Sequence, residues 1–447
     1  MNTTTLPTDP IATELRRIDQ LIAKGSLQEA ATALNAVQRR APGDARVPLA
    51  GMRLGVKAGN LSAAIDAARR ALALAPNWPV AMLELAALLI HKPGRKDEER
   101  DEALRLTGSA TALRPDDPDV LGNAANIAYA AGQKEQALAW WEHALARRPE
   151  DARLRLALAR GLIQCGRPAE AKPHFDWLEP HFAGDIHVLT GLLDCALSAG
   201  DEAAAQGYAD RALAAAPGDP IVQYWHAVAH GRTPPTQAAP AIASLFDGYA
   251  ERFDMHMVRG LKYKVPEQVA KMLLALHPDR KFNLLDLGCG TGLLGLYLGL
   301  IDGHIIGVDL SRKMIEQAAR HQVYARFHAV NILDALRDTP ADHYEAIACL
   351  DTLVYVGDLT PVIPNALRIL KPGGHFIFTC EAAQEGEPDL ALRQPSNRYA
   401  HRDTAVERLC RQAGFADVQI EHLPMLRMEG DVPLPGFLVT ARKAAAG

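Results

Sequence analysis

Three alternating glycines after an acidic residue form the part of the sequence best suited to bind a small molecule. Gly288, Gly290 and Gly292 follow Asp286 in the segment LLDLGCGTGLLGLYL (284–298). Glycine lets a backbone approach a ligand closely. An ionised carboxylate only accepts hydrogen bonds, so it attracts hydroxyl and ammonium groups. The spacing predicts a binding loop that joins a short strand to a helix.

The same loop also fits a dinucleotide site. Gly290, Gly292 and Gly295 match the pattern G-x-G-x-x-G, which presents a helix N-terminus to a pyrophosphate. Asp286 argues against that ligand, because its carboxylate would repel a pyrophosphate and attract an ammonium group. The loop therefore suits a nucleoside with a cationic tail and no phosphate, such as S-adenosylmethionine (SAM).

A second acidic residue, Asp309, ends the apolar run HIIGVD (304–309). In a doubly wound sheet the carboxyl ends of the first two strands meet beside the ligand crevice, where Asp309 would accept both ribose hydroxyls. That role alone would serve NAD equally well. The discriminating feature is the combination of D-x-G-x-G-x-G, an acid on strand two, and LKPGG (370–374) before strand five.

Short apolar runs alternate with amphipathic stretches throughout the second half of the chain. This alternation predicts parallel strands joined by crossover helices, an α/β fold. The last two strands are expected to form an antiparallel hairpin at one edge. We expect strands at 282–287, 304–309, near 325–330, 344–351, 375–381, 415–423 and 436–442, and helices at 293–301, from Ser311, around 359–370 and near 403–413.

This combination resembles the class I SAM-dependent methyltransferases over about 241–443. Three segments are similar to bacterial methyltransferases fused to tetratricopeptide repeat (TPR) arrays: LFDGYAERFDMHMVRGLKY before strand one, LDTLVYVGDL at strand four, and SNRYAH after strand five. The resemblance implies a Rossmann-like, seven-stranded domain that moves a methyl group from SAM to an acceptor.

The resemblance also assigns cofactor roles. By analogy, the glycines approach the methionine part of SAM, and the acids hold its amino group and ribose. The adenine amino group is expected to donate to the amide oxygen of Asn331, with Asp334 as the alternative. The cofactor-binding residues predicted in this way are Asp286, Gly288, Gly290, Gly292, Asp309, Leu310, Asn331 and Asp351.

Candidate catalytic residues lie near strands four and five. Methyl transfer needs an in-line nucleophile and, for a hydroxyl or ammonium acceptor, a base. His401 titrates in the right range, Asp351 would orient the acceptor or cap a turn, and Tyr355 would be a base or a pocket wall. Arg398 and Tyr399 are predicted to bind substrate.

Two residues before the first strand, Tyr249 and Arg252, are candidates for a lid over SAM. Simple packing of an amphipathic helix would account for them equally well.

Composition excludes several other classes. The net charge is -5 and neither half of the chain is basic, so we expect no nucleic-acid partner. The sequence has no signal-peptide pattern and no apolar run long enough to span a bilayer, which predicts a cytoplasmic protein without membrane contact. The histidines and six cysteines show no metal-ligand spacing, so no metal is predicted.

The first half of the chain repeats itself. One alanine recurs every 34 residues with a single interval of 39, a glycine usually precedes it by five, and a proline follows most copies by twelve. This pattern resembles the TPR, a two-helix unit in which the alanine allows close helix packing. The repeated alanines are Ala30, Ala64, Ala103, Ala137, Ala171 and Ala205.

These patterns divide the chain into four parts. We expect a disordered N-terminus (1–10), a solenoid of about six TPRs with a capping helix (11–230), a proline-rich linker (231–240) and the methyltransferase domain (241–447). The repeats would bind a protein partner or mediate self-association. The acceptor would be a metabolite or natural-product intermediate; the alternatives are a peptide or protein presented by the repeats, or a domain that binds SAM without turnover.

Overall fold

The computed structural model divides the protein into two compact units, Met1–Arg211 and Ala212–Gly447. Most of the predicted disordered N-terminus lies outside the residues that the structure describes, and Asp9 caps the first helix. Among the described residues, no helix is long and apolar enough to cross a membrane, and all six cysteines are free thiols. The described residues are 9–250, 253–254, 257, 260–394, 396–429 and 432–446.

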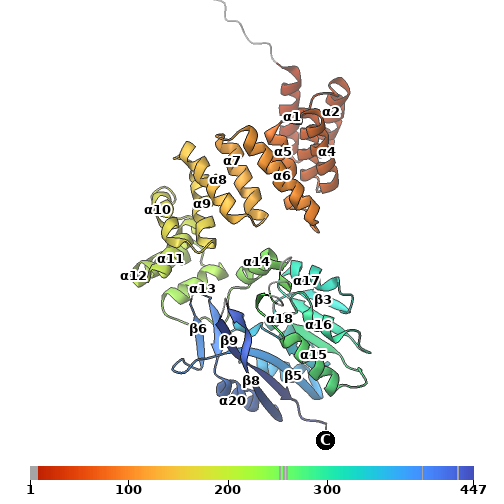
Figure 1. Cartoon of the computed structure of the whole chain (residues 1–447), viewed down its shortest axis with the longest axis vertical. Helices are drawn as coiled ribbons and strands as arrows, with labels where there is room; N and C mark the ends of the chain where they lie inside the picture. Colours follow the sequence, from red (N-terminus) through yellow and green to blue (C-terminus); the bar gives the residue numbers. More distant parts are fainter. Residues whose placement is uncertain are drawn as a thin grey trace, which may run out of the picture. The chain divides into compact units, whose positions relative to one another are not determined.

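The N-terminal part is a succession of helices, in which each helix from α1 to α10 packs against the next (Figure 1). Helices two apart, such as α1 and α3 or α5 and α7, also touch. The helices are α1 (Pro10–Lys24), α2 (Leu27–Arg40), α3 (Arg46–Lys57), α4 (Leu61–Leu74), α5 (Pro79–Ile90), α6 (Asp97–Leu113), α7 (Pro118–Ala130), α8 (Lys134–Arg147), α9 (Ala152–Gln164), α10 (Pro168–Leu178), α11 (Ile186–Ala199), α12 (Glu202–Ala215) and α13 (Pro220–Ala229).

The repeated alanines occupy the tightest positions of these helices. All six have an exposed fraction of 0%. The glycines at 25, 59, 132, 166 and 200 have positive φ, as a tight turn between two helices requires. The repeat therefore has a physical reason: a small residue where helices meet and a permissive one where the chain reverses.

The second unit contains one sheet with the strand order β3-β2-β1-β4-β5-β7-β6, to which β9 and β8 are added through β5. The four strands on the β3 side of β5 are parallel to their neighbours, and β9 is antiparallel to both β5 and β8. The strands are β1 (Leu284–Leu287), β2 (Ile305–Asp309), β3 (Arg326–Ala329), β4 (Tyr344–Cys349), β5 (Leu370–Ala382), β6 (Leu390–Arg393), β7 (Arg398–His401), β8 (Asp417–Glu429) and β9 (Val432–Arg442).

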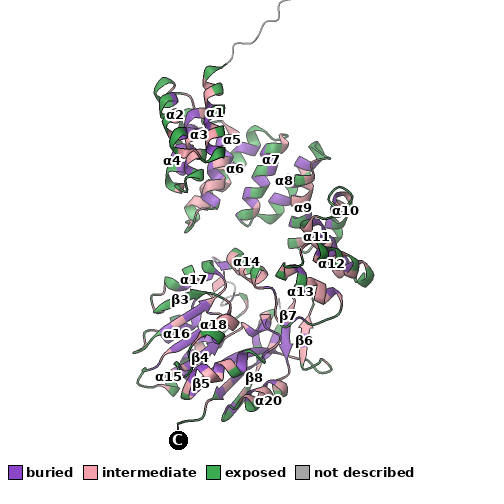
Figure 2. Ribbon diagram, turned by 180° about the vertical axis from the view of Figure 1, so that it is seen from behind, coloured by how far each residue is buried: buried purple, intermediate pink, exposed green. Residues whose placement is uncertain are grey.

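Helices cover both faces of this sheet. Strand residues alternate between two apolar clusters: Leu285 faces the cluster of α18 (Ile332–Asp338), α19 (Val362–Ile369) and α20 (Asp403–Ala413), and Leu284 faces that of α15 (Val265–Leu276) and α16 (Leu293–Leu298). Burial on both faces explains why the central strands read as continuous apolar runs. Figure 2 shows β4 and β5 mostly buried. The remaining helices are α14 (Ala239–Tyr249), α17 (Arg312–Ala319) and the 3-10 turn η3 (Leu353–Tyr355).

The predicted count of seven strands was wrong for the described part of the chain, which has a nine-stranded sheet. The additional hairpin, β6 and β7, contains the segment NRYAH, whose polar residues hid the strand. β7 pairs with Glu381 and Ala382 of β5. β4 pairs with β5 only as far as Phe378. β7 therefore pairs with the same edge of β5 beyond the point where β4 ends.

The predicted linker, 231–240, is not a free connection. Tyr399 Oη donates to the carbonyl of Pro234 at 2.8 Å, and the amides of Gly357 and Asp358 both donate to the carbonyl of Pro235 at 2.9 Å. These bonds tie the segment to the second unit, which begins before it.

We predict that the repeated alanines tolerate no larger side chain. Ala137→Leu in α8 should lower the free energy of unfolding by about 1–3 kcal/mol, because the position is fully buried against neighbouring helices. Ala139→Leu, at an exposed position of the same helix, is the matched control and should change it by less than about 0.5 kcal/mol. Urea unfolding followed by circular dichroism measures both; equal effects would contradict the packing assigned to Ala137.

Candidate functional site

A cavity of about 320 Å³ lies at the carboxyl ends of β1, β2 and β4. Parallel α/β sheets bind ligands in this crevice. Part of its lining comes from the strand ends and part from the segment 236–266 before the first strand. Two arginines, Arg398 and Arg427, complete the wall from β7 and β8.

The glycine loop after β1 has the backbone that only glycine adopts easily. Gly288, Gly290 and Gly292 all have positive φ, at 70°, 54° and 81°. A Cβ at Gly288 would lie 2.0 Å from Thr352 Oγ1, so the loop and the turn after β4 are in close contact. Gly288 and Gly290 line the cavity, whereas Gly292 does not and instead caps α16; their contact with a cofactor stays a prediction.

Asp286 is buried on β1, with 2% of its surface exposed, and it lines the cavity. Tyr324 Oη donates to its Oδ2 at 2.6 Å, and the Gly295 amide donates to the same hydroxyl at 3.2 Å. Burial raises the pKa of Asp286 to about 7, although the bond from Tyr324 opposes this shift. The carboxylate therefore gains strongly from a cationic partner.

Sequence analysis missed Tyr324, because it lies in a short loop before β3 that shows no motif. The Tyr324 ring also explains why glycine is needed at positions 292 and 295. A Cβ at Gly295 would lie 2.4 Å from the ring, and one at Gly292 would lie 3.0 Å from it. These two glycines make room for the tyrosine that holds Asp286.

Asp309 is the last residue of β2, as predicted, and it also lines the cavity. Its two oxygens accept from the Gly290 amide at 2.9 Å and the Ser311 amide at 2.8 Å. Burial raises the pKa of its carboxyl group and these amide bonds oppose the shift. Asp309 thus joins the glycine loop to the turn after β2, and Leu310 lines the cavity beside it.

Asn331 lines the cavity and caps α18, where its Oδ1 accepts from the Leu333 amide at 2.9 Å. The alternative residue, Asp334, is half exposed, pairs with Arg337 at 2.7 Å and is not part of the cavity lining. Of the two candidates for the adenine contact, Asn331 therefore lines the cavity and Asp334 does not, and the contact itself stays a prediction.

Asp351 follows β4 with a left-handed backbone, φ 51°, which is rare for a residue other than glycine. Its carboxylate pairs with the Arg427 guanidinium, which also pairs with Glu381 on β5. Burial raises the pKa of Asp351 to about 6, and the charge of Arg427 opposes this shift. Such local strain is a common mark of a functional position.

Arg427 was also missed by sequence analysis, since it is one charged residue in a late strand. Only 2% of its side chain is exposed, and its partner Glu381 is exposed by 1%. The C-terminal hairpin thus supplies the cation that allows two carboxylates to be buried beside the cavity.

The remaining predicted catalytic and substrate-binding residues fall into two groups: those that line the cavity and those that do not. Tyr355 lines the cavity in edge-to-face contact with Phe246, with ring centroids 5.5 Å apart, and burial raises its pKa to about 12. Arg398 also lines it and lies 3.1 Å from Glu381. Tyr399 and His401 do not line it.

The reason is the two-residue period of β7, which turns Arg398 to one face of the sheet and Tyr399 and His401 to the other. His401 is buried and its Nε2 lies 2.9 Å from the carbonyl of Gly357. Burial lowers the pKa of His401. This geometry does not support a role for His401 as the base.

The segment before β1 contacts the glycine loop and the turn after β2 through two acidic residues. Ser311 Oγ donates to Asp247 of α14 at 2.5 Å, and Thr291 of the glycine loop donates to Asp254. Tyr249 lines the cavity, as expected of a lid residue, while Arg252 lies outside the described residues.

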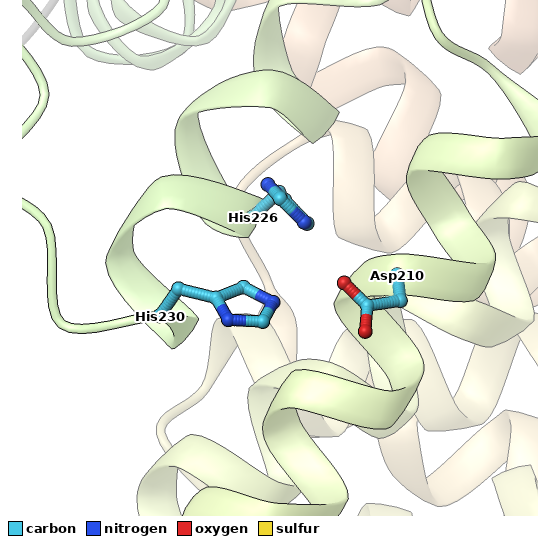
Figure 3. Close-up of side chains that lie close together, drawn as sticks. All are labelled: Asp210, His226 and His230. Carbon is cyan, nitrogen blue, oxygen red and sulfur yellow. The ribbon is translucent and has the colours of Figure 1, made fainter.

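Two histidines lie apart from the cavity lining. Figure 3 shows His226 and His230, whose ring centroids are 4.5 Å apart, at the end of α13. Arg232 Nη2 lies 3.0 Å from His226 Nδ1. Asp210, also labelled there, belongs to the first unit. That the protein uses no metal stays a prediction.

Residues 257–420 match a family model described as a methyltransferase domain. The second unit contains a SAM-dependent methyltransferase domain. The match covers the sheet from β1 into β8 and therefore includes both the glycine loop and Asp309. The cofactor of this domain is SAM, and the buried acid of β1 and the acid ending β2 fit its ammonium group and its ribose.

Two relatives have related activities in their names. A ubiquinone biosynthesis O-methyltransferase of Alkalilimnicola ehrlichii is 28% identical over 143 residues, which is 31% of this chain and 55% of the relative. A phosphoethanolamine N-methyltransferase of Triticum aestivum is 30% identical over 156 residues, which is 33% of this chain and 30% of the relative. The chain spans about half, or less, of the length of these relatives.

Among solved structures, a SAM-dependent methyltransferase of Thermotoga maritima, described as a possible histamine N-methyltransferase, is similar with a TM-score of 0.35 and 20% identity. The similarity covers 45% of this chain and 99% of that protein. A TM-score of this size carries no argument about function.

We predict that Arg427 is required for stability. Arg427→Met should lower the free energy of unfolding by about 3–5 kcal/mol, because it leaves the largely buried Asp351 carboxylate without its countercharge and Glu381 with Arg398 in place of two close arginines. Arg337→Met, which removes an exposed ion pair, should cost less than about 1 kcal/mol. Urea denaturation compares the two; similar losses would contradict a buried charge pair.

We also predict that SAM binding depends on pH through Asp286. The carboxylate must be ionised to hold an ammonium group, so the affinity for SAM should fall as the pH drops below about 7, by up to about tenfold per unit. The stability of the protein without SAM changes with pH in the opposite direction. As the pH rises, Asp286 ionises in the unfolded chain from about pH 4 but in the folded protein only near pH 7. This group therefore lowers the free energy of unfolding between about pH 4 and about pH 7.

Tyr324→Phe removes the bond that lowers the pKa of Asp286, so it should weaken SAM binding and move the midpoint of its pH dependence upward. Tyr297→Phe, an exposed tyrosine on α16, is the control and should leave both unchanged. Calorimetric titration of SAM between pH 5.5 and 8.5 measures the midpoint of the pH dependence. The same midpoint for the native protein, Tyr324→Phe and Tyr297→Phe would refute the role assigned to Tyr324.

Proposed function

We propose that the protein transfers a methyl group from SAM to an oxygen or nitrogen atom of a small organic acceptor. The observation that carries this proposal is the pair Asp286 and Asp309, on neighbouring strands of one cavity with the glycine loop between them. A dinucleotide would place a pyrophosphate against that loop, beside a carboxylate with 2% exposure. A ligand with an ammonium tail neutralises the same carboxylate.

The residues of the chain would act chiefly by positioning. Bound SAM supplies a methyl group that is already electrophilic, so the cavity must align a nucleophile with it and exclude water. Asp286, Asp309 and Asn331 would fix the cofactor. Asp351 and Tyr355 would contact the acceptor from the end of β4, and Arg398 from β7.

The size and composition of the cavity favour a small acceptor. Apolar residues such as Ile242, Phe246 and Phe253 form much of its lining, and side chains of the segment before β1 cover one side. The names of the relatives include both O- and N-methyltransferases. We therefore place a metabolite or natural-product intermediate first, a peptide or protein acceptor second, and binding of SAM without turnover third.

We further propose that the N-terminal helices form a TPR array for partner binding or self-association. The support is the period of the buried alanines and the hairpin order of the helices. The N-terminal segment (1–10), most of which lies outside the described residues, the repeats (11–230), the segment 231–240 and the catalytic domain (241–447) remain the proposed divisions, and a cytoplasmic location remains a proposal.

We predict that both acids are needed for the cofactor. Asp286→Ala and Asp309→Ala should each weaken SAM binding by at least about tenfold to a hundredfold, since each removes a charged or paired hydrogen-bond acceptor. Asp302→Ala, an exposed acid just before β2, is the matched control. Calorimetry with unchanged affinity in both variants would defeat the cofactor assignment.

Turnover is tested separately with methyl-labelled SAM and an extract of the source organism. Label appearing in any product with the native protein, and not with Asp286→Ala, supports the enzyme. Bound SAM without any transferred label would support the third alternative instead.

A further inference from the structure

A buried tyrosine hydroxyl without a partner lies in the wall of the cavity. Tyr263 is 6% exposed, lines the cavity, and its Oη has no hydrogen-bond partner among the described residues. A buried hydroxyl normally finds a partner, because leaving it unsatisfied costs free energy. The open cavity beside it is where that partner would sit.

The position of Tyr263 is fixed from both sides. Its own amide donates to the carbonyl of Met257 at 3.0 Å, and the Met428 amide of β8 donates to the carbonyl of Leu261 at 2.8 Å. Arg427, which pairs with Asp351, directly precedes Met428. The strand that supplies the buried cation therefore also anchors the tyrosine.

Charges near this hydroxyl show which ligand group would meet it. Burial raises the pKa of the Tyr263 phenol, the Asp351 carboxylate raises it further, and the Arg427 guanidinium opposes the shift. Tyr263 offers a donor and Asp351 an acceptor, and both line the cavity. A group that both donates and accepts one hydrogen bond would satisfy the two together.

The same wall disfavours a charged ligand group. Arg427 pairs with Asp351 and Glu381, and Arg398 pairs with Glu381 and Glu429, so both arginines of the lining already have countercharges. An ammonium or carboxylate head would enter a buried wall that holds no unpaired opposite charge for it, which costs free energy. A neutral head avoids that cost.

Other residues of the cavity lining are apolar and partly aromatic. Phe246 packs edge to face on Phe253 and on Tyr355, with centroid distances of 6.1 and 5.5 Å. Met257 and Leu261 extend this surface toward Tyr263. Such a surface fits a flat apolar ring.

We propose that the acceptor is an uncharged aromatic hydroxyl, whose oxygen accepts from Tyr263 and whose proton is donated to Asp351. This inference rests on the proposed function and adds the chemical class of the acceptor and a binding residue, Tyr263. In the transfer, the acceptor oxygen forms a bond to the methyl carbon as the carbon–sulfur bond breaks. The electron pair stays on sulfur, and the hydroxyl proton passes to Asp351.

Arg427 keeps its second carboxylate, Glu381, when Asp351 takes up the proton. The raised pKa of Asp351, about 6, agrees with a carboxylate able to hold that proton briefly near neutral pH.

The test compares three probes with one apolar body and different heads: 4-propylphenol, 4-propylbenzylamine and 4-propylbenzoate. Each is titrated calorimetrically into the full-length protein saturated with S-adenosylhomocysteine. We expect the phenol to bind at least tenfold more tightly than the ammonium or the carboxylate. Equal or tighter binding of a charged probe, or no binding of the phenol, would overturn the proposal.

Tyr263→Phe identifies the hydroxyl. It should weaken binding of the phenol about fivefold to tenfold and leave the affinity for SAM within twofold of the native value. Tyr297→Phe is the control, and thermal melting confirms that both variants fold. A Tyr263→Phe protein that loses SAM affinity but keeps phenol affinity would assign the hydroxyl to the cofactor tail and overturn the proposal.

Failure of the proposed function itself looks different. In that case the native protein would bind no SAM, or would bind it without transferring label to any product, whatever the response to the three probes.

Discussion

A carboxylate buried inside an apolar parallel sheet is the constraint on which the second unit depends. Asp286 lies between β2 and β4, where water does not stabilise its charge. Tyr324 meets part of that need, and the space for its ring is created by Gly292 and Gly295. The glycine-rich loop therefore serves an internal tyrosine as well as a ligand. Among the described residues the Asp286 carboxylate has a hydroxyl partner but no cationic one. The ammonium group of the cofactor tail would supply that positive charge.

A second buried carboxylate group beside the cavity, Asp351 with Glu381, is stabilised by a different kind of partner. Asp351 and Glu381 are held by Arg427, a residue far along the chain on a hairpin that joins the sheet through β5. One acidic group is thus held by a neutral hydroxyl and the other two by a cation. The first site keeps its attraction for an ammonium group, while at the second Arg427 and Arg398 together balance the two carboxylates. The two sites in one cavity consequently favour different ligand groups.

The sequence predicted the strands that carry short-range signals, and the missed features depend on contacts between distant residues. The motif around Gly288 and the acid ending β2 have fixed spacings, so both were found at the strand ends. Tyr324 and Arg427 carry no local pattern; only the folded sheet shows that they meet Asp286 and Asp351. The strand β7 was hidden by its polar residues, and its two-residue period then separated Arg398 from His401, which their spacing alone had grouped together.

The anchoring of Tyr263 by β8 has a consequence for how the site is made during synthesis. Arg427 is the last residue of the cavity lining in the chain, and the neighbouring amide of Met428 holds the segment that carries Tyr263. While the ribosome is still adding residues before this point, the acceptor wall cannot be complete, because both its buried cation and the strand amide that anchors the Tyr263 segment are missing.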